Sequence, residues 1–198
     1  MKTIGITGGV GAGKSTVLNY IEEHYNAYII IADKLAYELE SPGGVCYESI
    51  VGLLGGDILD DTGFIDKKKM ASRIFSEPDL LKRVNDIIHP AVKQSILDII
   101  DKERQSGRFD YLIVEAALLI EEGYGAILDE LWYIRVDSDI RRARLKESRG
   151  YSDEKIDSII ASQLSDEEYM KNCKYVIDNS GCTEDTYRQI SSIFRITG

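Results

Sequence analysis

The sequence predicts an α/β fold in which five parallel strands form one sheet covered by helices on both faces. Five short apolar runs bounded by turn residues indicate the strands, and helical patterns lie between most of them. Continuously apolar strands are typical of a sheet that is buried on both faces. Strands that alternate with helices indicate a parallel sheet with right-handed crossovers. The predicted strands are Lys2–Thr7, Tyr28–Ile31, Tyr111–Val114, Leu131–Val136 and Tyr175–Ile177.

One long stretch interrupts this alternation. Residues 33–110 read almost wholly as helix and turn, which is far more chain than a crossover helix needs. The excess predicts a helical insertion, residues 34–109, near the carboxyl edge of the sheet, where open α/β sheets bind ligands. A purely decorative insertion is the alternative. The predicted helices are Ser15–Glu23, Lys34–Glu40, Pro78–Arg104, Ile140–Glu147, Asp153–Leu164 and Thr183–Phe194.

The most informative motif directly follows the first predicted strand. Residues 8–16 read GGVGAGKST and satisfy the phosphate-loop pattern G-x-x-x-x-G-K-[ST], with a helical pattern after them. In such a loop the backbone N–H groups and the helix N-terminus face the phosphates. Lys14 would reach the β- and γ-phosphates, and the Ser15 hydroxyl would bind Mg²⁺. The motif predicts a nucleoside triphosphate site, rather than a glycine-rich turn that only joins strand to helix.

Other motifs bear on the class of phosphate-loop protein. The guanine-reading tetrapeptide Asn-Lys-x-Asp of GTPases does not occur, and Asp60–Gly63 matches D-x-x-G without a preceding apolar strand. ATPase motors usually carry a strand that ends in Asp-Glu, whereas the strand ending at Glu115 offers one carboxylate. These observations favour a small-molecule kinase, which predicts a three-layer sandwich of the phosphate-loop kinase kind.

A kinase also needs a carboxylate that accepts the proton of the acceptor hydroxyl. Asp33 is the candidate, because it follows the second predicted strand, where its side chain would project over the phosphate loop. The alternative is that Asp33 caps a helix beginning at Lys34, and the two interpretations are compatible.

A basic segment is the second requirement, since a lid must close over the phosphates and exclude water. Residues 135–149 hold six basic side chains against three acidic ones, in a chain of net charge −10. Arg141 and Arg144 lie three apart, hence on one helix face, and a guanidinium there could stabilise the transferring phosphoryl group. A solvated helix face is the alternative.

Composition limits the remaining classes. A length of 198 residues suits one well-buried domain, and a net charge of −10 argues against a general nucleic-acid-binding role. The three cysteines have no metal-ligand spacing, which indicates reduced thiols. The N-terminus carries no targeting pattern and the apolar runs are too short to cross a bilayer, so we expect a soluble cytoplasmic protein.

Several segments together resemble the dephospho-coenzyme A kinase family, in the right order and over nearly the whole chain. The His-Pro and Asp-Asn-x-Gly elements are weak singly and specific jointly. The segments that carry the resemblance are Ile4–Thr16, Ala32–Ala36, Ile87–Val92, Val114–Gly123, Gln163 and Val176–Gly181.

The resemblance implies ATP and Mg²⁺ as cofactors and phosphorylation of the ribose 3′-hydroxyl of dephospho-coenzyme A. Asp33 would accept the hydroxyl proton, and Lys14, Arg141 and Arg144 would neutralise the transferring phosphate, the two arginines from a lid at residues 138–165. Residues assigned to ATP are Gly8, Gly9, Gly11, Ala12, Gly13, Lys14, Ser15, Thr16 and Asn179. Ser15 and Glu115 are assigned to the metal, and His89 and Arg149 are assigned to the substrate. His89-Pro90 could instead orient the start of a helix.

Five positions depart from the family pattern, and one of them is Glu115, where aspartate is frequent. Ile31 stands where a second acid is usual, Lys67 where arginine is common, and Ala117 where proline is. Ser148 occupies the place of a basic residue, with Arg149 one position late, which puts individual substrate contacts in doubt.

The expected partner is therefore a small-molecule substrate, with no nucleic acid or membrane, and the chain would be a monomer or a weak homo-oligomer. Two other functions stay open: a kinase of another small metabolite or nucleotide, and a non-catalytic ATP-binding switch.

Overall fold

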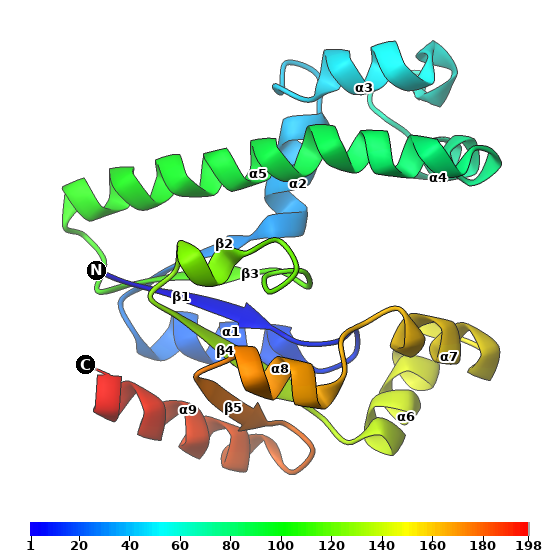
Figure 1. The fold of residues 1–198 in the computed structure, drawn as a ribbon. Helices are drawn as coiled ribbons and strands as arrows, with labels where there is room; N and C mark the ends of the chain where they lie inside the picture. The colour runs from blue at the N-terminus through cyan, green and yellow to red at the C-terminus, as the bar shows by residue number, and fades with distance from the viewer. Residues whose placement is uncertain (198) are drawn as a thin grey trace. The chain divides into compact units, whose positions relative to one another are not determined.

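The computed structural model describes residues 1–197, and these divide into two compact units (Figure 1). One unit combines residues 1–29 with the chain from residue 103 onward, and the other is residues 30–102. Each is described by itself.

The sheet has five strands in the order β2-β3-β1-β4-β5. Their bounds are β1 Lys2–Thr7, β2 Ala27–Ile31, β3 Tyr111–Glu115, β4 Glu130–Arg135 and β5 Tyr175–Asp178. Strand β1 pairs in parallel with β3 and β4, and β4 pairs in parallel with β5. The predicted five-stranded parallel α/β fold is confirmed, and the strand boundaries move by one residue at most.

In the first unit, helices pack against the sheet and bury its apolar strands. Helix α9 packs against β5 and α1, and α8 packs against β4. Trp132 is fully buried, and its indole N–H donates to the buried carboxylate of Glu130 at 3.0 Å. The helices of this unit are α1 Lys14–His24, η2 Tyr124–Ala126, α6 Ser138–Arg149, α7 Asp153–Ala161, α8 Asp166–Asn172 and α9 Thr183–Thr197.

The second unit is mainly helical. Its elements are α2 Ala32–Glu40, α3 Tyr47–Leu54, η1 Gly56–Ile58, α4 Lys67–Ser76 and most of α5 Pro78–Ser106. A core cluster holds it together: Cys46, Ile50, Leu54, Ile58, Ile65, Leu80 and Val84.

Several details differ from the sequence interpretation, which named no helix for α3 or α4. Pro90 lies inside α5, so the alternative that His89-Pro90 begins a helix is wrong. Helix α8 was not predicted, because seven residues carry little periodicity, yet Ser165 and Glu168 form a reciprocal capping box at its start. Among the described residues, no helix is long and apolar enough to span a bilayer.

Candidate active site

The phosphate loop leaves the carboxyl end of β1 and enters α1. Gly13 precedes the helix in the left-handed conformation, with φ of 83°. The N–H of Ala12 donates to the carbonyl of Gly9 at 3.1 Å, and that of Thr16 donates to the carbonyl of Gly13 at 3.0 Å. These two bonds fold the loop tightly around the N-terminus of α1, as an anion site requires.

Close neighbours explain why glycine is needed in this loop. A Cβ on Gly9 would lie 2.3 Å from an Nη atom of Arg141, and one on Gly13 would lie 2.3 Å from Nδ2 of Asn179. A Cβ on Gly8 would lie 2.6 Å from the carbonyl oxygen of Ile134. Side chains and backbone of the same unit therefore press directly on the loop, and glycine alone leaves room for them.

Lys14 already points along the loop. Its Nζ donates to the carbonyl oxygen of Gly8 at 2.9 Å and lies 3.4 Å from a carboxylate oxygen of Glu115. Glu115 reaches this place because it pairs in register with Ile6 at the end of β1. Ser15 lies exposed in the first turn of α1. An ammonium, a hydroxyl and a carboxylate thus gather around the loop, with chemistry suited to phosphate and Mg²⁺.

The two arginines of α6 reach the loop in different ways. Arg141 donates from Nε to the carbonyl of Val10 at 2.7 Å and from Nη2 to the side chain of Gln163. Burial lowers the pKa of the Arg141 guanidinium from its ordinary value. Arg144 donates from Nη2 to the carbonyl of Asn179 at 2.9 Å. Its Nη1 is buried without a hydrogen-bond partner in the described part of the chain, 3.6 Å from where a Cβ on Gly13 would stand.

An unpartnered buried guanidinium N–H beside an anion loop is unusual, because buried polar groups nearly always find partners. A phosphate oxygen would supply the missing acceptor with a charge-assisted bond. Arg144 is therefore better placed than Arg141 to contact a phosphate.

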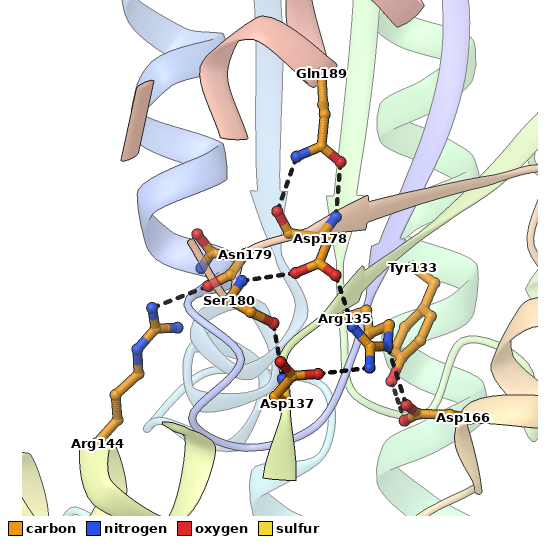
Figure 2. Close-up of polar contacts among 9 residues, drawn as sticks. All are labelled: Tyr133, Arg135, Asp137, Arg144, Asp166, Asp178, Asn179, Ser180 and Gln189. Carbon is orange, nitrogen blue, oxygen red and sulfur yellow. Dashed lines mark hydrogen bonds and ion pairs between the residues drawn. The ribbon is translucent and has the colours of Figure 1, made fainter. Parts of the chain in front are cut away.

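Asn179 directly follows β5, and its carbonyl accepts from Arg144 (Figure 2). Its Nδ2 donates to the carbonyl of Ala12 at 2.8 Å, and its Oδ1 accepts from the hydroxyl of Thr186 at 2.9 Å. Both side chains are buried. No motif in the sequence singles out Thr186 for this role, although it lies only seven residues after Asn179. Gln163 lies in one of the segments that carry the resemblance, but its bond with Arg141 has no sequence signal of its own.

In the second unit, Asp33 lies in the first turn of α2. The helix begins at Ala32 after Ile31, and no side chain caps it, so the interpretation of Asp33 as the cap of a helix at Lys34 is wrong. Asp33 instead lines an open cavity with Lys34, Tyr37, Glu38 and Lys67.

The charges around this cavity are coupled. The ammonium of Lys67 lies 5.1 Å from the ring centroid of Tyr37. Burial raises the pKa of Glu40 on the same helix, and the charge of Asp33 adds to the rise while Lys67 opposes it. The cavity therefore offers acidic and basic groups together.

The remaining predicted contacts lie further along the chain. His89 is half-buried within α5, and Arg149 is the exposed last residue of α6, with its guanidinium 5.9 Å from the ring centroid of Tyr151. Ser148 donates to the carbonyl of Arg144 within the helix at 2.6 Å. Across the described residues, no group of three or more acidic, histidine or cysteine side chains could hold a metal ion.

Comparison with known proteins decides the family. A family model described as dephospho-CoA kinase matches residues 2–185. The chain belongs to the dephospho-CoA kinase family. Members of this family are transferases, so the chain is a kinase with a small-molecule substrate.

Two relatives in the dephospho-CoA kinase family are similar to this chain over nearly their whole length. The dephospho-CoA kinase of Geobacter sulfurreducens is 37% identical over 98% of each chain. That of Aquifex aeolicus is 36% identical, over 98% of this chain and 96% of the relative. The solved structure of the dephospho-CoA kinase from Campylobacter jejuni has the same fold, with a TM-score of 0.75 at 21% identity, over 100% of this chain and 98% of that one.

Proposed function

We propose that this chain transfers the γ-phosphate of ATP to the ribose 3′-hydroxyl of dephospho-coenzyme A, giving coenzyme A and ADP, the last step of coenzyme A synthesis. Family membership supports the reaction. The observation that carries the ATP site is the buried, unpartnered Nη1 of Arg144 beside the phosphate loop.

The phosphate loop holds ATP in this proposal. The triphosphate accepts hydrogen bonds from the backbone N–H groups of the loop and of the N-terminus of α1, and Lys14 contacts the β- and γ-phosphates. Arg144 donates its spare N–H to a phosphate, while Arg141 fixes the carbonyl of Val10. The ATP-binding set is the predicted one: Gly8, Gly9, Gly11, Ala12, Gly13, Lys14, Ser15, Thr16 and Asn179.

Ser15 and Glu115 would hold Mg²⁺, directly or through water. Kinase sites bind Mg²⁺ through one or two protein oxygens and the phosphates, so they need no larger protein cage. The ion would neutralise charge that develops on the β- and γ-oxygens during in-line transfer. The ion pair of Lys14 with Glu115 keeps both groups at the loop.

Asp33 would accept the proton of the 3′-hydroxyl. Its exposed carboxylate is not used to cap α2, so it is available to a ligand in the cavity that it lines. Residues 34–109 would hold the acceptor, with His89 and Arg149 as substrate contacts, and residues 138–165 would close as a lid.

A coupled ADP-release assay tests the reaction. We expect ADP release to depend on added dephospho-coenzyme A and to fall at least a hundredfold in Asp33→Ala, since general bases contribute roughly 10²–10⁴-fold. The affinity for ATP should be unchanged in that variant. Asp61→Ala, an exposed acid of the same unit, is the control and should keep full turnover.

Two outcomes would contradict the proposal. Equal turnover of a nucleoside monophosphate would favour a kinase of another nucleotide. Tight ATP binding without acceptor-stimulated ADP release would favour a switch module.

We also propose a cytoplasmic enzyme that is a monomer or a weak homo-oligomer and binds no nucleic acid. The net charge of −10 supports the last point. Light scattering after size-exclusion chromatography would measure the mass of the particle.

A further inference from the structure

Arg135 joins three carboxylates from three separate elements of the first unit. It is the last residue of β4, at the same strand end as the phosphate loop on β1. Its Nη1 lies 2.6 Å from Asp178, its Nη2 lies 2.6 Å from Asp137, and its Nε lies 3.4 Å from Asp166 (Figure 2).

Each partner lies at the start or end of a helix or strand, and two of these elements, α6 and β5, adjoin the residues that contact the phosphate loop. Asp137 directly precedes α6, which carries Arg141 and Arg144. Asp178 ends β5 and directly precedes Asn179. Asp166 begins α8 and also accepts from the hydroxyl of Tyr133 at 2.6 Å.

Hydrogen bonds link two of these elements a second time. The N–H of Asp137 donates to the hydroxyl of Ser180 at 2.9 Å, and the N–H of Ser180 donates to Asp178 at 2.8 Å. The N–H of Asn179 donates to the carbonyl of Arg135 at 2.8 Å. The start of α6 and the segment after β5 are therefore fixed together, with the guanidinium between them (Figure 2).

We propose that Arg135 is a positioning residue of the ATP site. It holds the start of α6 against residues 178–180, so that Arg144 contacts Asn179 and keeps its spare N–H directed at the phosphate loop. Arg135 itself touches neither the loop nor Arg144 through any contact described above. The inference rests on the proposed function in taking ATP as the ligand.

Electrostatics favours this role over an incidental surface pair. Three carboxylates converge on one cation, so removing the cation leaves three negative charges that repel one another. Partial burial opposes ionisation of Asp178, but hydrogen bonds from Ser180 and the charge of Arg135 hold its pKa below the ordinary value. Without the Arg135 side chain, the bonds from the N–H of Asp137 to Ser180 and from the N–H of Asn179 to the carbonyl of residue 135 remain. We expect them to hold the start of α6 less firmly against residues 178–180, so that ATP binding would have to order these segments.

The test compares Arg135→Met with wild type by titrating ATP, without acceptor, in a calorimeter. We expect the Kd for ATP to rise roughly tenfold, as the loss of a supporting contact commonly produces. The KM for ATP should rise in parallel, while the KM for dephospho-coenzyme A changes by less than about twofold. Arg188→Gln, which removes an exposed ion pair of α9 in the same unit, is the matched control.

A double-mutant cycle with Arg144→Met shows whether Arg135 acts through Arg144. If it does, Arg144→Met costs much less ATP affinity in the Arg135→Met background than in wild type. A purely structural role would lower the melting temperature and leave the two effects on ATP affinity additive. Additive effects, or a rise in Kd below about twofold, would overturn the inference.

Arg135→Lys covers the case in which the methionine variant folds poorly. A single ammonium keeps the charge but cannot form a guanidinium fork, so we expect an intermediate loss of ATP affinity. Full wild-type affinity in the lysine variant together with additivity in its cycle with Arg144→Met would also overturn the inference. If the wild-type protein shows no acceptor-stimulated turnover, the proposed acceptor is wrong. The ATP titrations would still test the role of Arg135, because they contain no acceptor.

Discussion

Replacing Asn179 with alanine should destabilise the first unit, even without a nucleotide. The substitution removes the bond from Nδ2 to the carbonyl of Ala12 and the bond from the hydroxyl of Thr186 to Oδ1. Asn179 is 5% exposed and Thr186 is fully buried, so water cannot easily replace the lost partners. A buried polar group left without a partner costs about 1–3 kcal/mol, and the two losses together should cost about 2–6 kcal/mol.

Unfolding can be followed with one natural probe. Trp132, the single tryptophan, is buried in β4 of the same unit, and its fluorescence reports loss of that sheet. For a chain of this size, about 2–6 kcal/mol corresponds to a fall in melting temperature of about 4–24 °C. Asn172→Ala, whose side chain donates to a carbonyl at the exposed end of α8, is the control and should shift it far less. A fall for Asn179→Ala no larger than that of the control would refute the role of the amide in bracing the loop.

Two further substitutions test the phosphate loop and the buried carboxylate of Glu130. Gly13→Ala should abolish ATP binding in a calorimetric titration, because its Cβ would meet Asn179 at 2.3 Å and its φ of 83° is strained for alanine; wild-type affinity would contradict this. Burial alone would raise the pKa of Glu130, but hydrogen bonds from Lys174 and Trp132 hold it below its ordinary value. The ionised carboxylate of Glu130 therefore stabilises the fold fully when the pH is above the ordinary pKa of glutamate. This contribution is lost as the pH falls through the lowered pKa of Glu130 in the folded protein. Between pH 7 and pH 3, the melting temperature of Glu130→Gln should thus change less than that of wild type, and equal slopes would refute the argument.

Local patterns predicted the strands and most helices because burial on both faces leaves a signal in the sequence itself. The start of α2 was harder to place, since its first residue, Ala32, continues the apolar run of β2. Helix α8 escaped because its signal is a pair of hydrogen bonds at Ser165 rather than an apolar period.

The site was only partly predictable for a similar reason. The phosphate loop is contiguous, so its residues could be named from the pattern alone. Spacing placed Arg141 and Arg144 on one helix face but could not distinguish them, because their partners come from remote segments. The guanidinium of Arg141 donates to Val10 from Nε and to Gln163 from Nη2, whereas Arg144 donates to Asn179 from Nη2 and leaves Nη1 without a partner in the described part of the chain. The role of Arg135 depends in the same way on pairing between β4 and β5, which no local pattern encodes.

The loop is held by its carbonyl groups, and this explains how it can present N–H groups to an anion. Alternate carbonyls, those of residues 8, 10 and 12, accept from Lys14, Arg141 and Asn179. These donors come from α1, from α6 and from the segment after β5, so the conformation of the loop is set by three elements during folding. Because these carbonyl oxygens already accept hydrogen bonds from the protein, the loop is ordered before the ligand binds. Binding then costs little conformational entropy, which favours high affinity. It follows that loss of any one donor should weaken ATP binding even when that side chain never touches the nucleotide.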